Sequence, residues 1–130
     1  MELKIGIRGT AETVVTEENT AKSAGSGNLQ VFGTPYMIAL MEKAACEAVA
    51  PYLDEGCTTV GTQLNVAHLA ATPLGDRVTA EVELVEIDRR RLCFKVTARD
   101  SVDLIGEGTH ERFIIQADRF LEKANAKKGS

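Results

Sequence analysis

The pattern of apolar and polar positions predicts one long helix in the first half of the chain. Thr34 and Pro35 form a typical helix start, because a threonine oxygen can cap free backbone amides and proline at the first helical position gives up no needed donor. The predicted helix runs to Val49 or Ala50, where Pro51 ends it. We therefore expect a helix with Thr34 as its cap.

Strands are predicted on both sides of this helix. Segment Glu2–Arg8 alternates apolar and polar residues, so an edge strand is expected there. Four stretches after the helix share the two-residue period of strands: 58–71, 77–87, 92–99 and 104–116. Short polar connectors at 88–90 and 100–103 are typical of hairpins, which predicts that these four strands follow one another in a meander.

Two segments lack a clear packed element. Residues 17–30 are rich in Ser, Gly and Asn, which predicts a mobile loop or lid before the helix. The tail at 120–130 is expected to form a frayed helix or an extension. The element order indicates a two-layer α+β domain, in which an antiparallel sheet of about five strands covers one face of the helix. A second copy is expected to cover the face that remains open, so we predict a dimer.

Size and charge narrow the possible functions. With 130 residues and 14.0 kDa, the chain has the size of one domain, 1–130, and no segment resembles a linker. Its 19 acidic and 15 basic side chains give a formal charge of −4, which argues against nucleic acid as a partner. Residues 56–75 carry no charge but hold many polar side chains, so no membrane partner or span is expected.

The amino terminus and the cysteines predict a compartment. The first ten residues, MELKIGIRGT, place charges among the apolar positions, unlike a signal peptide, so we expect a cytoplasmic protein. The three cysteines are odd in number and lack CxxC spacing, which argues against both a disulfide framework and a zinc site. We expect no metal and no redox cofactor.

Glu42 is the first candidate for chemistry. On a helical wheel its neighbours within about 60° are apolar; these are Val49, Ile38, Cys46, Ala39 and Ala45. A carboxylate in an apolar stripe is costly unless it is hydrogen-bonded, and burial favours a form suited to proton transfer. The alternative is a glutamate that accepts structural hydrogen bonds beneath a loop.

His68 and Thr34 are the other candidates. By the two-residue period, His68 shares an inward strand face with Val60, Thr62, Leu64 and Val66. It is either a hydrogen-bonded core residue or, if the helix crosses this strand, a partner of Glu42 in a hydrolytic site. The helix start at Thr34 offers free amides and a positive dipole end, which would stabilise a thioester oxyanion.

A basic hairpin tip leaves two interpretations open. Arg89, Arg90 and Arg91 are followed by Lys95. These residues form either a solvated tip or a contact for the phosphates of a nucleotide-bearing substrate.

Several motifs resemble those of hotdog-fold thioesterases of the fluoroacetyl-CoA thioesterase type. The matching stretches are Val31–Thr34, Leu40–Glu42, Ala50–Leu53, His68 with Ala70–Pro73, Arg90–Leu92 and Gly108–Arg112. The resemblance covers about residues 31–125. Its specific part is the spacing, since Thr34 precedes Glu42 by eight residues and Glu42 precedes His68 by twenty-six, as in the family's active-site set.

The resemblance implies acyl-CoA hydrolysis at a dimer interface. Gly61 and Arg112 match positions that the family uses around the acyl end of the substrate. The fluoroacetate-specific member closes its site with an aromatic-rich lid, whereas residues 19–30 contain no aromatic side chain here. Selectivity for fluoroacetyl-CoA is therefore not expected from this segment.

These observations predict a thioesterase that hydrolyses a small acyl-CoA. Glu42 would act as base or transient acyl acceptor, Thr34 as hydrogen-bond partner at the oxyanion end, and His68 as proton donor to the leaving thiolate. The two uses of Glu42 require the same residue in the same place, so the sequence leaves both open. The alternative is a hotdog module that binds acyl-CoA without turnover, as a sensor or accessory protein.

Overall fold

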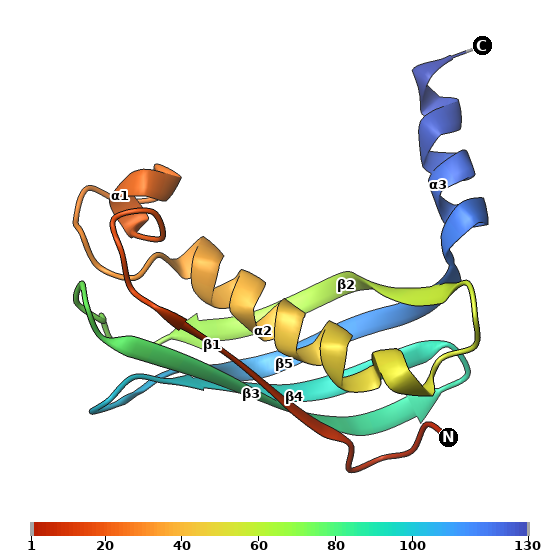
Figure 1. The fold of residues 1–130 in the computed structure, drawn as a ribbon, viewed down its shortest axis with the longest axis horizontal. Helices are drawn as coiled ribbons and strands as arrows, with labels where there is room; N and C mark the ends of the chain where they lie inside the picture. The colour runs from red at the N-terminus through yellow and green to blue at the C-terminus, as the bar shows by residue number, and fades with distance from the viewer. Residues whose placement is uncertain (1, 130) are drawn as a thin grey trace.

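A five-stranded antiparallel sheet curls around one long helix in the computed structural model, which describes residues 2–129 (Figure 1). The strands are β1 (Arg8–Val14), β2 (Cys57–His68), β3 (Arg77–Asp88), β4 (Arg91–Arg99) and β5 (Leu104–Gln116). The α-helices are α1 (Ala21–Ala24), α2 (Thr34–Val49) and α3 (Ala117–Asn125), and single 3₁₀ turns follow α2 and α3 at Ala50–Tyr52 and Ala126–Lys128. The predicted α+β architecture, with one long helix and about five strands, is confirmed.

The order of strands in the sheet is β1-β3-β4-β5-β2. The predicted meander is correct for β3, β4 and β5, which pair in sequence through short connections. It is wrong for β2, which pairs with β5 and forms one edge of the sheet. The chain therefore crosses from one edge to the other side of the sheet between β2 and β3, and β2 keeps one unpaired edge.

Helix α2 buries an apolar stripe against the inner face of the sheet. The buried helix residues are Met37, Leu40, Met41, Ala44, Ala45 and Val49. They pack with inner side chains that alternate along β3 and β4, such as Leu84, Phe94 and Val96. Each large side chain buried here contributes about 1.5–3 kcal/mol to stability. Because α2 packs mainly across β1 and β3, it covers the β5 and β2 side of the sheet less completely.

The first strand lies later in the chain than predicted. The alternation of Glu2–Arg8 indicated a strand there, but the structure has a turn at Ile5 and Gly6, with φ +100° at Gly6, and β1 begins at Arg8. The true strand shows little apolar alternation because small residues face the helix. At Gly9 a Cβ atom would lie 2.6 Å from the Cβ of Ala48, so only glycine permits this close approach.

The expected loop at 17–30 contains one short helix, α1, none of whose four residues is buried. Thr20 and Ser23 form a reciprocal capping box at the start of α1, and the Thr20 side chain is buried. The tail predicted from residue 120 is part of helix α3, which points away from the sheet and leaves Phe120 and Leu121 exposed (Figure 1). Among residues 2–129, no helix is long and apolar enough to cross a membrane.

Candidate active site

Thr34 and His68 meet where the start of α2 lies against the end of β2. A hydrogen bond of 2.7 Å joins Thr34 Oγ1 and His68 Nδ1. The prediction that Thr34 caps the helix is wrong, because Gly33 is the cap residue and Thr34 is the first helical residue. Its hydroxyl makes no capping bond and is directed to the imidazole instead. Two of the predicted site residues are therefore in contact within a single chain, whereas the expected partner of His68 was Glu42.

The imidazole of His68 is half-buried and has one free ring nitrogen. Burial lowers the pKa of His68 below its ordinary value, so the ring is neutral at physiological pH. Among the described residues, His68 Nε2 is the one buried side-chain nitrogen or oxygen without a hydrogen-bond partner. A buried polar atom of this kind needs an explanation, and a substrate atom is a natural partner for it.

A β-bulge decides which residues of β2 face the helix. The register of β2 against β5 shifts between Gly61 and Gln63, which leaves Thr62 as the extra residue. The prediction of one common face for Val60, Thr62 and His68 is wrong, because the bulge changes the alternation at Thr62. Thr62 bonds Glu111 on the outer face, whereas His68 lies opposite Gly106 on the inner face.

Glu42 lies at the side of the buried helix stripe and not within it. Its side chain is 43% exposed, and the predicted stripe neighbour Ala39 is also exposed. The buried stripe is rotated away from Glu42 because α2 packs toward β1 and β3. Glu42 instead faces the less covered side of the sheet, where its Oε2 lies 3.9 Å from Arg112 Nη1. A carboxylate that is exposed on one side and paired on the other is available to a ligand.

Gly61 and Arg112, which the family resemblance assigns to the acyl end of the substrate, lie beside Glu42. They are opposite each other in the β2–β5 register. A Cβ atom at Gly61 would lie 2.7 Å from Glu42 Oε2, so the glycine makes room for the carboxylate. The Arg112 side chain is only 7% exposed, and such a buried cation requires fixed partners.

Thr59 and His110 supply those partners. Arg112 donates from Nε to Thr59 Oγ1 at 2.8 Å and from Nη2 to the Thr59 carbonyl at 2.9 Å. Its Nη1 lies 3.1 Å from His110 Nε2. Thr59 and His110 were not among the predicted site residues. His110 could have been found, because it lies two residues before Arg112 and strand alternation puts both on one face.

A pocket of about 840 Å³ opens beside the Thr34–His68 pair. The helix start contributes Thr34, Pro35 and Ile38, and the segment after β2 contributes residues 69–71. The segment before the helix contributes Ala21 and Ser26. The part of the pocket wall that residues 17–30 contribute is therefore built from small side chains.

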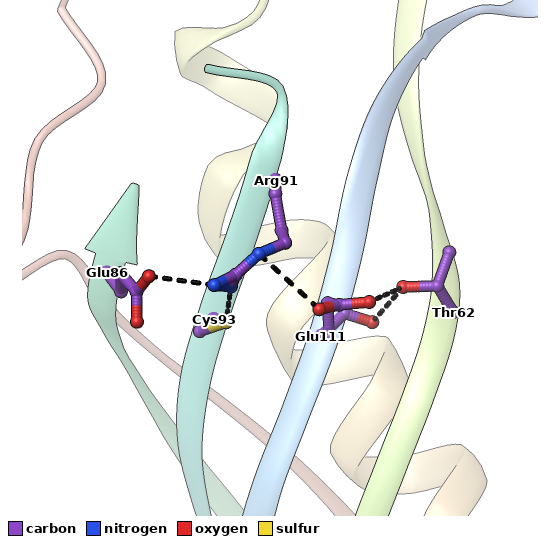
Figure 2. A network of polar contacts seen from close by, with 5 residues as sticks. All are labelled: Thr62, Glu86, Arg91, Cys93 and Glu111. Carbon is purple, nitrogen blue, oxygen red and sulfur yellow. Dashed lines mark hydrogen bonds and ion pairs between the residues drawn. The ribbon is translucent and has the colours of Figure 1, made fainter. Parts of the chain in front are cut away.

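A polar network lies on the outer face of the sheet, on the side away from α2 (Figure 2). Arg91 lies 2.8 Å from Glu86, 3.6 Å from Glu111 and 2.6 Å from Cys93 Sγ. Thr62 donates to Glu111 at 2.7 Å. The network reaches the bulge in β2 and a second register shift between Leu84 and Glu86 in β3. It therefore connects both irregular strands across β4 and β5.

The site consists of two parts along one helix. Thr34 with His68 forms one part, and Glu42 with Gly61 and Arg112 forms the other. Eight residues of helix separate Thr34 from Glu42, which corresponds to about 12 Å along the axis. Hydroxyl, imidazole and carboxylate are the groups that acyl-transfer hydrolysis uses.

The curled sheet around one helix is the hotdog fold of the thioesterase superfamily. A thioesterase superfamily member from Thermus thermophilus is 29% identical, with a TM-score of 0.88 over 96% of this chain and 93% of that chain. The family model of the fluoroacetyl-CoA-specific thioesterase, FlK, matches residues 15–118. This chain belongs to that family, which confirms the resemblance found in the sequence.

Individual relatives agree with this assignment. The fluoroacetyl-CoA thioesterase of Streptantibioticus cattleyicolor is 40% identical over 96% of this chain and 94% of its own length. A crystal structure of the fluoroacetyl-CoA thioesterase FlK is 39% identical, with a TM-score of 0.92 and 98% of both chains covered. A FlK variant solved with fluoroacetate and CoA is 40% identical, with a TM-score of 0.85 over 91% of this chain and 99% of that chain.

Proposed function

We propose that this protein hydrolyses a small acyl-CoA to the free acid and CoA, with Thr34, Glu42 and His68 as catalytic residues. The observation that carries the proposal is the 2.7 Å contact between Thr34 Oγ1 and His68 Nδ1 beside an open pocket. Membership of a thioesterase family supports the reaction class. Fluoroacetyl-CoA, acetyl-CoA and propionyl-CoA are the substrates to compare first.

Glu42 has two possible roles in this reaction. As a general base it takes a proton from water while the water oxygen attacks the thioester carbonyl carbon. As a nucleophile it attacks that carbon itself, and water then hydrolyses the resulting anhydride. Either role requires a carboxylate that is reachable from solvent, and the half-exposed side chain of Glu42 meets this requirement. Arg112 and Gly61 beside it would contact the acyl end of the substrate.

His68 and Thr34 act on the sulfur and the oxygen of the thioester. Because the ring is neutral, His68 protonates the leaving CoA thiolate after its unpartnered Nε2 has accepted the proton that the attacking water gives up. The bond to Thr34 fixes the ring orientation. Thr34 also lies at the first turn of α2, where the helix dipole favours the negative charge that develops on the carbonyl oxygen.

The active enzyme is a homodimer in this proposal. Strand β2 has one unpaired edge, and Gly61 and Glu42 lie on the side of the molecule that α2 covers least. A two-fold arrangement across this side would bring the Thr34–His68 part of one protomer to the Glu42 part of its partner. This would complete each site, because the two parts are about 12 Å apart along one helix.

The cytoplasm is the proposed location. All three cysteines are free thiols, at Cys46, Cys57 and Cys93. Free thiols are typical of proteins in a reducing compartment. The enzyme and its acyl-CoA substrates would then be in the same compartment.

The test is the rate of thiol release from a panel of small acyl-CoAs by wild type and by Glu42→Gln. The amide can neither take a proton nor form an acyl intermediate, so the rate should fall at least about a hundredfold while the fold is kept. Glu47→Gln is the matched control, because Glu47 is an exposed glutamate on the same helix. Normal hydrolysis by folded Glu42→Gln would reject the role of Glu42. Binding of acyl-CoA without any thiol release by wild type would identify a non-catalytic module.

A further inference from the structure

His110 is buried beside Arg112 and has both ring nitrogens engaged. Its Nδ1 lies 2.9 Å from the backbone carbonyl oxygen of Gln63, and its Nε2 lies 3.1 Å from Arg112 Nη1. The side chain is 2% exposed, and its ring lies 6.2 Å from that of Phe94. The proposed reaction does not use this histidine directly.

The two neighbours fix the protonation state of the ring. A carbonyl oxygen can only accept, so Nδ1 carries the proton and donates to Gln63. A guanidinium can only donate, so Nε2 must present its lone pair to Arg112. Only the neutral ring with its proton on Nδ1 satisfies both bonds.

This state determines where Arg112 points. The Nε and Nη2 atoms of Arg112 are bound by Thr59, and His110 takes one hydrogen of Nη1. The guanidinium is planar and rigid, so these three contacts fix its plane. The remaining direction of Nη1 leads to Glu42 Oε2 at 3.9 Å.

We propose that His110 is a positioning residue that, as a neutral hydrogen-bond acceptor, holds Arg112 toward Glu42 and the acyl end of the substrate. The inference rests on the proposed function of Glu42 and Arg112 and adds a residue to it. His110 does not touch the reacting atoms and acts through Arg112.

Protonation of His110 would break this arrangement. A proton on Nε2 would turn the acceptor into a donor and place a second positive charge against Arg112. Burial lowers the pKa of His110 below its ordinary value, and the charge of Arg112 lowers it further. Two carboxylates oppose this effect, Glu42 from α2 and Glu111 from the same strand. The neutral state is therefore favoured at physiological pH, and Arg112 should lose its orientation at acidic pH.

Nitrogen-15 NMR of the imidazole rings tests the protonation state without any assay of activity. His68 and His110 are the two histidines of the chain, so His110→Gln assigns the signals directly. The expected result is a ring protonated on Nδ1 and unprotonated on Nε2, with a midpoint below the ordinary value of about 6.5. A ring protonated on Nε2, or a midpoint at or above that value, would overturn the proposal.

Two substitutions then separate positioning from packing. In His110→Gln the amide oxygen can accept from Arg112 and cannot ionise in this range, whereas His110→Phe fills similar space without an acceptor. We expect kcat/KM within about threefold of wild type for His110→Gln and a loss of about tenfold to a hundredfold for His110→Phe, the scale of a lost hydrogen bond to a charged group. Wild type should lose kcat/KM at acidic pH as His110 becomes protonated. His110→Gln should not show this loss. Thr109→Val, on the exposed side of the same strand, should behave as wild type.

The outcomes distinguish this inference from the proposed function. Equal rates for His110→Gln and His110→Phe, whether both high or both low, would overturn the positioning role. If Glu42→Gln is inactive in the same assays, the proposed function stands and only the inference about His110 fails. If Glu42→Gln is active, the proposed function itself fails, and the NMR result alone then decides the state of His110.

Discussion

Mixed dimers offer a direct test of how the two parts of the site combine. The structure pairs Thr34 with His68 in one chain and places Glu42 with Arg112, about 12 Å farther along α2. If each site takes Thr34 from one protomer and Glu42 from its partner, a dimer of Thr34→Ala with Glu42→Gln has one site with both lesions and one with neither. Such a dimer should have about half the wild-type rate, if its sites act independently.

The expected recovery can be calculated for a refolded mixture. Random assortment of equal amounts makes about half of the dimers mixed, and half of their sites are intact, so the mixture should reach about a quarter of the wild-type rate of thiol release. Each variant alone should be nearly inactive. Differently tagged protomers, captured through both tags, verify that subunits have exchanged.

The Thr34–His68 contact supplies a matched control for this experiment. Because both residues belong to the same part of the site, a mixture of Thr34→Ala with His68→Ala leaves one lesion in every site and should recover no activity. Failure of the first mixture to recover, despite proven exchange, would place Thr34 and Glu42 of one chain in the same site. Recovery in the second mixture would contradict the pairing of Thr34 and His68.

Three further predictions follow from particular residues. Gly61→Ala should lower kcat/KM at least about tenfold with little change in Tm, because the added Cβ would lie 2.7 Å from Glu42 Oε2; unchanged kinetics would show that the carboxylate moves aside freely. Fluoroacetyl-CoA and acetyl-CoA should differ only slightly in kcat/KM, since Ala21 and Ser26 form the wall from residues 17–30 and a small group is worth about 1–3 kcal/mol; a ratio above roughly a thousandfold would require another source of closure. The free energy of unfolding should decrease as pH falls below about 6.5, because burial lowers the pKa of His68 and His110 in the folded state and the unfolded chain binds protons first. Urea titrations at about pH 7 and about pH 5.5 measure this decrease, and equal stability at both would contradict it.

The bounds of helices and strands were predicted most accurately where the hydrophobic period of the sequence agrees with the packing of the element. Helix α2 and strands β3, β4 and β5 begin and end within a residue or two of their predicted bounds. Strand β1 was misplaced because its inner positions are small residues such as Gly9, which pack closely but give no apolar signal. The position of β2 at the sheet edge was also missed, because strand order depends on long-range pairing that period does not encode.

The candidate site was predicted in its residues but not in all of its contacts. Periodicity made Thr34, Glu42 and His68 candidates and the resemblance gave them one active-site spacing, and the structure brings Thr34 and His68 together. The wheel placed Glu42 in the buried stripe because it was centred on Glu42, whereas the buried residues Met37, Leu40 and Met41 lie to one side of that centre. The partners of Arg112 come from two strands far apart in sequence, so only the folded sheet shows them together.

Beyond the bulge at Thr62, the length of β2 is as important as its composition. Deleting Thr62 itself would restore regular pairing with β5 and keep Leu64, Val66 and His68 on the inner face. Deleting one residue between Gln63 and His68 would instead turn the side chains that follow it to the opposite face and move His68 away from Thr34. A substitution at Thr62 would leave these orientations unchanged. Insertions and deletions between Gln63 and His68 should therefore be tolerated far less than point changes, and a mutant library aimed at this pocket should vary side chains while keeping the residue count between Gln63 and His68 constant.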